Sequence, residues 1–121
     1  MREIEFRGKM IGADVWRYGY IRCICGDDYA INSPVERYCW SIAIGTAGQY
    51  TGLLDKNGRK IFEGDILRVQ TSRTDPAVYD NRVVEYKAPY FTGFIFDKGE
   101  YEPQYHEIIG NIHDNPKLVE K

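Results

Sequence analysis

The segment that most constrains the fold runs from Thr46 to Leu67, because strand-forming residues and turn residues alternate along it at close intervals. Tyr50 to Leu54 and Arg59 to Phe62 carry the aromatic and branched residues typical of β-strands. Between them, Asp55-Lys56-Asn57-Gly58 suits a tight turn with its glycine at a positive φ angle. The segment therefore predicts a β-hairpin with its turn at residues 55–58.

A second turn follows directly, at Glu63-Gly64-Asp65, before a strand expected at Ile66 to Gln70. We expect Asp65 to close this turn by accepting a hydrogen bond from a nearby backbone N–H. The acidic residues of both turns also suggest a cation site or an acid-base pair. Side chains two residues apart at a turn do not converge reliably, so we interpret them as structural. The residues to which we assign this role are Asp55, Asn57, Gly58, Glu63, Gly64 and Asp65.

The rest of the chain also favours strands. Ile4 and Phe6 alternate with charged residues before Gly8, which predicts a half-buried strand that ends at a turn. Asn115 precedes a proline, so a single helical turn is expected at Pro116 to Glu120 with Asn115 as its N-cap. Further strands are expected at Val15 to Ile24, with Gly19 as a bulge or close-approach point, and at Tyr29 to Asn32, Val83 to Lys87, Tyr90 to Phe96 and Tyr105 to Ile112. We therefore predict a mainly β fold, a small closed barrel or roll.

Composition limits the classes of function. A chain of 121 residues fits one domain, and a net charge of -2 gives no overall positive field for nucleic acid or anionic lipid. The three cysteines are odd in number, and the first residues contain no apolar stretch long enough for a signal peptide, so we expect a reducing cytoplasm. The longest nearly apolar run, Ser41 to Gly48, is far below the roughly 20 residues that span a bilayer, so no membrane role is expected.

Candidate metal ligands are few. Cys23 and Cys25 would point to one face of a strand, and Cys39 or His106 would then complete a zinc site. The spacing is C-x-C rather than the stronger C-x2-C, and there is no second cysteine pair. Free cysteine is more commonly a small buried hydrophobic residue. We therefore expect no bound metal.

The histidines give no clear catalytic pattern. His106 and His113 are seven residues apart, which places them on opposite faces of one continuous strand. His106 beside Glu107 suggests a general acid or base, but no serine or cysteine has a recognisable nucleophile setting. A surface imidazole at a strand end is the plainer interpretation. The glycines at 45, 48 and 52 also lack a phosphate-binding fingerprint, so we expect neither a catalytic residue nor a cofactor.

A basic and aromatic surface is the strongest functional signal. It surrounds Thr71 to Asn81, which is polar, contains a proline and is predicted to be a surface loop. Arginine and aromatic side chains anchor protein partners and also stack on nucleic acid bases. In the alternative interpretation, most of these aromatics fill the core. The candidate interaction residues are Arg68, Arg73, Tyr79, Arg82, Tyr90 and Phe91, with Tyr86 nearby.

Seven motifs distributed over nearly the whole chain resemble the YopX family of phage and prophage proteins. They are Phe6-Arg7-Gly8, Trp16 with Tyr18-Gly19, Gly48-Gln49-Tyr50-Thr51-Gly52-Leu53, Asp55-Lys56-Asn57-Gly58, Ile61-Phe62-Glu63-Gly64-Asp65, Ile109-Gly110-Asn111-Ile112 and Asn115-Pro116. The resemblance implies an SH3-type β roll around the turn at residues 63–65. It also implies a bacteriophage or integrated prophage as the source, and no established biochemical activity.

We therefore predict a single domain over residues 1–121, with an N-terminal β region at about 1–45 and an SH3-like β roll at about 46–121, followed by a short helical turn. The expected function is that of a non-enzymatic accessory protein in the cytoplasm of a bacterial host, which binds a protein partner or self-assembles. The alternative is a nucleic-acid-binding module that uses Arg68, Arg73 and Arg82. A hydrolase or metal enzyme centred on His106 or Cys23 is the third interpretation.

Overall fold

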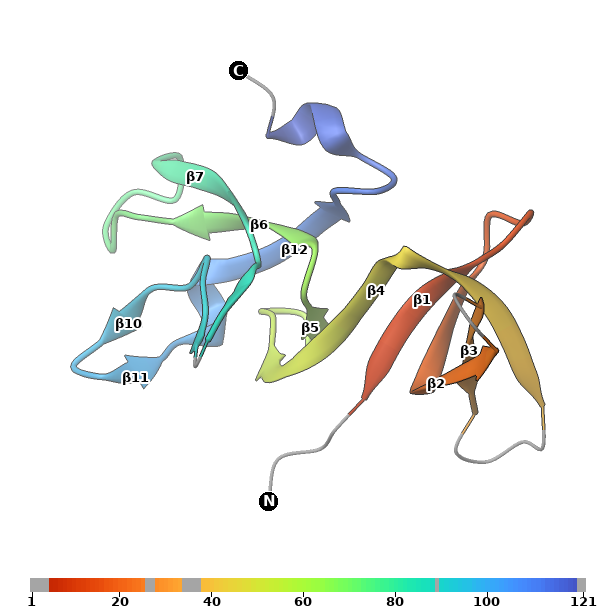
Figure 1. Cartoon of the computed structure of the whole chain (residues 1–121). Helices are drawn as coiled ribbons and strands as arrows, with labels where there is room; N and C mark the ends of the chain where they lie inside the picture. Colours follow the sequence, from red (N-terminus) through yellow and green to blue (C-terminus); the bar gives the residue numbers. More distant parts are fainter. Residues whose placement is uncertain (1–4, 26–27, 34–37, 89, 120–121) are drawn as a thin grey trace. The chain divides into compact units, whose positions relative to one another are not determined.

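The computed structural model in Figure 1 describes residues 5–25, 28–33, 38–88 and 90–119. The predicted mainly β fold is confirmed, since nearly all regular elements are strands and every strand pair described is antiparallel. The chain divides into two compact units, Met1–Tyr50 and Thr51–Lys121. Strand β4 (Cys39–Leu54) contains the point of division.

The first unit is built from β1 (Phe6–Met10), β2 (Trp16–Cys25), β3 (Asp28–Asn32) and most of β4. The pairing order is β1-β2-β3-β4, and β1 also pairs with β4. The prediction that Gly8 ends the first strand is wrong, because Gly8 lies inside β1 opposite Arg17. A side chain at Gly8 would collide with Ile42, which explains why glycine is suited to this position within the strand.

Gly19 is a close-approach point rather than a bulge. Its pairing with Phe6 is regular, and its φ angle is +151°. A Cβ atom at Gly19 would overlap the carbonyl oxygen of Asn32 on the neighbouring strand β3. Only glycine permits strands β2 and β3 to approach this closely at that position.

Strand β4 begins much earlier than the strand expected from Tyr50. The register with β1 shifts so that Arg7 pairs with Gly48 while Lys9 pairs with Ala43. Thr46 holds this irregular region, because its hydroxyl donates to the Ala43 carbonyl at 2.6 Å and accepts from the Lys9 N–H at 2.9 Å. Because this part of β4 contains small residues and a register shift, its sequence does not show the alternation of apolar and polar residues that predicts a strand.

The second unit contains the end of β4 with β5, a three-stranded sheet and two small hairpins (Figure 1). The sheet has the order β12-β6-β7. The bounds of the elements are β5 Lys60–Phe62, β6 Asp65–Gln70, β7 Tyr79–Val83, β8 Tyr86–Lys87, β9 Tyr90–Phe91, β10 Phe96–Asp97, β11 Glu100–Tyr101 and β12 His106–Asn111, with 3-10 helices η1 Pro103–Tyr105 and η2 Pro116–Leu118.

Three expectations for this unit need correction. The predicted loop at residues 71–81 ends earlier, because β7 begins at Tyr79 and pairs with β6. The expected strand at residues 90–96 is divided, and the hairpin of β10 and β11 turns through Lys98 and Gly99, both at positive φ. Asn115 makes no side-chain cap to η2; instead, its Oδ1 atom accepts from the Asn111 N–H at 3.3 Å.

The core of the second unit is formed by β5, β6 and the segment after β7. Ile61, Leu67, Val69 and Val84 are completely buried and form one cluster. The partly buried residues that pack against this cluster are Leu53, Phe91, Phe94, Ile95, Tyr101 and Ile108. Leu67 and Val69 share one face of β6, whereas Arg68 and Gln70 lie on the other face together with the buried Ile66.

Candidate functional site

Asp55 is the most highly coordinated side chain of the 55–58 turn. Its Oδ1 atom accepts hydrogen bonds from the backbone N–H groups of Asn57 and Arg59, both at 2.9 Å. Its Oδ2 atom accepts from the Ile108 N–H at 3.1 Å and from the Arg59 guanidinium at 3.3 Å. The carboxylate is completely buried, so it joins the turn to β12 across 53 positions of sequence.

The electrostatics of Asp55 favour a structural role. Burial alone would raise the pKa of its carboxyl group, because the charged form loses hydration. The N–H groups of Ile108, Arg59 and Asn57 and the Arg59 charge outweigh this effect and hold the pKa below its usual value. A carboxylate that stays ionised and is committed to backbone donors is a poor proton donor in catalysis.

His106 is completely buried at the start of β12, so the prediction of a surface imidazole is wrong. Its Nδ1 atom lies 2.9 Å from the carbonyl oxygen of Glu102, and the Ile95 N–H donates to Nε2 at 3.1 Å. A carbonyl accepts and an N–H donates, so these partners assign the proton to Nδ1 and leave Nε2 without one. The imidazole is therefore neutral and serves to join three backbone segments.

The pKa of His106 is lowered, which also favours the neutral imidazole. Burial lowers it most, the Glu102 carbonyl opposes this change, and the positive charge of Arg82 lowers it further. Both ring nitrogens already have backbone partners. This imidazole offers no vacant nitrogen to a substrate.

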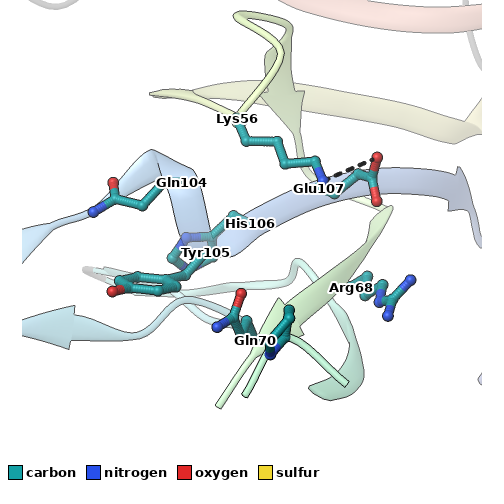
Figure 2. A pocket seen from close by; sticks show the side chains of 8 residues that line it. Lys56, Arg68, Gln70, Gln104, Tyr105, His106 and Glu107 are labelled. Carbon is teal, nitrogen blue, oxygen red and sulfur yellow. Dashed lines mark ion pairs between the residues drawn. The ribbon is translucent and has the colours of Figure 1, made fainter. Parts of the chain in front are cut away.

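A surface hollow of about 140 Å³ lies where β6, β12 and the loop after β6 meet (Figure 2). Its lining is predominantly polar and includes two cations, one carboxylate and two amides. The ion pair drawn in Figure 2 joins Lys56 Nζ to Glu107 Oε2 at 3.6 Å. The lining residues are Lys56, Arg68, Gln70, Pro76, Gln104, Tyr105, His106 and Glu107. We treat this hollow as the candidate functional site.

Arg68 is the cation of the hollow with the best-defined position. Its guanidinium carbon lies 3.8 Å from the ring centroid of Tyr79, which comes from the paired strand β7. Arg68 also lies opposite Glu107 of β12 in the register of the sheet. A guanidinium that stacks on an aromatic ring restricts its own motion, and the N–H groups at its edge can still donate hydrogen bonds.

The structure does not bring the three candidate arginines onto one surface. In β7, Arg82 lies opposite Leu67, whose side chain is in the core, whereas Arg68 lies opposite Asn81. Successive side chains of a strand point to opposite faces, so Arg68 and Arg82 lie on opposite faces of the sheet. Arg73 lies in the loop between β6 and β7.

Two of these arginines have acidic partners. Arg73 Nη1 lies 3.3 Å from Glu102 Oε2, and Arg82 Nη2 lies 3.2 Å from Asp80 Oδ2. The aromatic candidates also separate, since Tyr90 is 73% exposed in β9 while Phe91 packs against the core cluster. The six candidates therefore form several small groups rather than one basic and aromatic patch.

The remaining turn residues have defined local contacts. Gly58 and Gly64 have φ angles of +78° and +93°, which only glycine adopts without strain. Asp65 Oδ2 accepts from the Phe62 N–H at 2.8 Å and closes the second turn. Glu63 is partly buried beside it. The structure thus places these residues at turns rather than in a convergent carboxylate site.

The metal interpretation has no support in the described part of the chain. No group of three or more possible ligands converges among those residues. Cys39 is an exposed free thiol, whereas the side chains of Cys23 and Cys25 lie outside the described part. His113 follows the end of β12 and is separated from His106 by the length of that strand.

None of the described helices is long and apolar enough to cross a bilayer.

Sequence reasoning missed most of the residues around the hollow. Lys56, Gln70, Gln104 and Tyr105 come from a turn, a strand end and a 3-10 helix, and no motif links them. From the sequence, Glu107 is distinguished only as the neighbour of His106. Pairing of the strand at residues 66–70 with the last strand would bring these residues together, but the alternation pattern alone does not determine that pairing.

These features define a class: a mainly β protein of antiparallel sheets with a polar surface hollow. The sequence matches the family described as YopX protein over residues 3–120, so the chain belongs to that family and the suspected resemblance is confirmed. No curated protein matches the chain. The fold is similar to the crystal structure of protein EF1440 from Enterococcus faecalis, with a TM-score of 0.60 and 23% sequence identity, over 99% of this chain and 100% of that one.

Proposed function

We propose that this chain is a non-catalytic accessory protein of a bacteriophage or prophage, which acts in the bacterial cytoplasm by binding a protein partner or by self-assembly. Membership of the YopX family supports the phage origin. We also propose an SH3-type roll for the second unit, as the family resemblance implies. The hollow at β6 and β12 is the proposed contact site.

One observation carries the non-catalytic part of this proposal. Asp55 and His106 are two buried groups for which the sequence suggests acid-base chemistry. Backbone groups occupy the hydrogen-bonding positions of both side chains. Catalytic acids and bases need a free position for the proton that they transfer. Saturation by backbone partners is the pattern expected of residues that stabilise a fold.

The exposed aromatics support protein contact. Tyr79, Tyr86, Tyr90 and Phe96 are between 45% and 73% exposed in the second unit. Tyrosine and arginine are enriched among residues that dominate the energy of protein interfaces. The stacked pair of Arg68 and Tyr79 combines the two types at the edge of the hollow.

Nucleic acid binding through Arg68, Arg73 and Arg82 is the second candidate. It is less favoured because Arg68 and Arg82 lie on opposite faces of the sheet, and because Arg73 and Arg82 have acidic partners. Fluorescence anisotropy with labelled single- and double-stranded DNA and RNA tests it. Binding that falls with salt and weakens in arginine-to-alanine variants would replace the protein-binding proposal.

The direct test of the proposed function combines sedimentation velocity with affinity capture from a phage-infected host lysate. The bait variant is Tyr79→Ser, which removes the 45% exposed ring that stacks on Arg68 at the hollow, and the control is Tyr20→Ser, which removes a tyrosine that is 55% exposed in the first unit. We expect self-association or capture of a protein, which Tyr79→Ser weakens and Tyr20→Ser leaves unchanged. A monomer that captures nothing above background would overturn the proposal.

A further inference from the structure

We propose that the hollow at β6 and β12 binds the carboxylate of an aspartate or glutamate side chain on the partner protein, with Arg68 as the principal contact. This inference rests on the proposed protein-binding function and specifies its partner chemistry. It follows from the state of Arg68, from the charges around the hollow and from its size. Each of these observations comes from within the second unit.

Among the residues that the structure describes, the Arg68 guanidinium stacks on a ring and has no hydrogen-bond acceptor. Across the described residues, no carboxylate lies within ion-pair distance of this guanidinium, which contacts the ring of Tyr79. A guanidinium carries five N–H donors in a planar fork that matches the two oxygens of a carboxylate. Stacking restricts the plane of this fork before a ligand arrives, which reduces the entropy cost of binding.

The neighbouring carboxylate does not satisfy Arg68. Glu107 lies directly opposite Arg68 in the register of the sheet, yet it forms an ion pair with Lys56. Lys56 and Arg68 together carry two positive charges and Glu107 carries one negative charge. The hollow therefore has one uncompensated positive charge, which favours an anionic ligand.

The size and lining of the hollow narrow the choice of anion. Its volume of about 140 Å³ is below the range of roughly 300 to 1,000 Å³ that holds a cofactor or drug-sized ligand. A single acidic side chain fits this space. Gln70, Gln104 and Tyr105 also line the hollow (Figure 2), so it contains further polar groups besides Arg68.

The test is a titration of the full-length ¹⁵N-labelled protein followed by NMR. The probe is a terminally blocked Gly-Glu-Gly peptide, compared with the Gly-Gln-Gly peptide and with inorganic phosphate. The readouts are the Nε–H resonance of Arg68 and the side-chain amide resonances of Gln70 and Gln104. The variant is Arg68→Gln, and the matched control is Arg82→Gln, which removes the same charge from the opposite face of the sheet.

We expect the glutamate peptide to give saturable shifts with a dissociation constant on the order of 1 to 10 mM, as for one charged contact. Arg68→Gln should weaken binding by about tenfold or more, since it removes a charged, bidentate contact. Arg82→Gln should change it less than about twofold. Arg68→Lys, which retains the charge and loses the fork, should give an intermediate loss and serves if Arg68→Gln does not fold.

Three results would overturn the inference: no saturable shift, equal binding of the glutamine peptide, or tighter binding of phosphate than of glutamate. An equal loss in Arg82→Gln would also overturn it, because the effect would then be a general one of charge. The result that would refute the proposed function is a different one. A captured partner or an oligomer that survives Arg68→Gln refutes the carboxylate contact and leaves protein binding intact.

Discussion

Replacing Asp55 with asparagine is expected to destabilise the protein by about 2 to 4 kcal/mol. The substitution keeps the size of the side chain and one acceptor oxygen, which retains the bonds to Asn57 and Arg59. It places an amide NH₂ group opposite the donors that now bond to Oδ2, the Ile108 N–H and the Arg59 guanidinium. Two contacts with a charged acceptor are lost, each worth about 1 to 2 kcal/mol, and donors then face donors in a buried site.

The pH dependence gives an independent check. The pKa of Asp55 is lower in the folded protein than in the unfolded chain, so the unfolded chain binds more protons when the pH is low. The stability from this group is therefore present above the ordinary aspartate pKa of 3.8 and is lost as the pH falls through the folded value. Asp55→Asn should remove this part of the acid dependence.

The assay is urea denaturation followed by circular dichroism, with amide hydrogen exchange at Ile108 as a local readout. The matched control is Asp75→Asn, because exposed Asp75 also accepts one turn N–H bond, from Ala77 at 2.9 Å. The control should cost less than about 1 kcal/mol. Equal losses in the two variants, or an unchanged acid dependence in Asp55→Asn, would refute the reasoning.

Three further predictions concern single groups in the second unit. His106→Phe should lower the free energy of unfolding by about 2 to 3 kcal/mol, because it leaves the Ile95 N–H without its acceptor in the interior. In the wild-type protein, burial lowers the pKa of His106, so stability should fall as the pH drops below the ordinary histidine pKa of 6.5. Gly64→Ala should cost about 1 to 2 kcal/mol because the glycine has a φ angle of +93°, whereas Gly45→Ala, with open space at the Cβ position, should cost much less. Burial, and secondarily the charge of Asp55, raise the pKa of Tyr101, so spectrophotometric titration should show one tyrosine that ionises after the others, and Tyr101→Phe should abolish that late step.

The local part of this structure was accessible from the sequence because its causes are local. The turn at residues 55–58 and the positive φ angle of Gly64 depend on residues only a few positions apart. Such turns restrict the chain whatever surrounds them. The family motifs contain the same turns, so the resemblance and the physical pattern led to the same segment.

The sequence by itself determined the mainly β class, the central hairpin and the family. The tertiary structure alone decided that His106 is buried, that Arg68 and Arg82 face apart, and that a polar hollow forms beside Glu107. These outcomes depend on strand register and on contacts between residues far apart in sequence, such as the bond from the Ile108 N–H to Asp55. A one-residue change of register would exchange the faces of a strand, and local sequence patterns fix register only weakly where both faces are mixed in polarity.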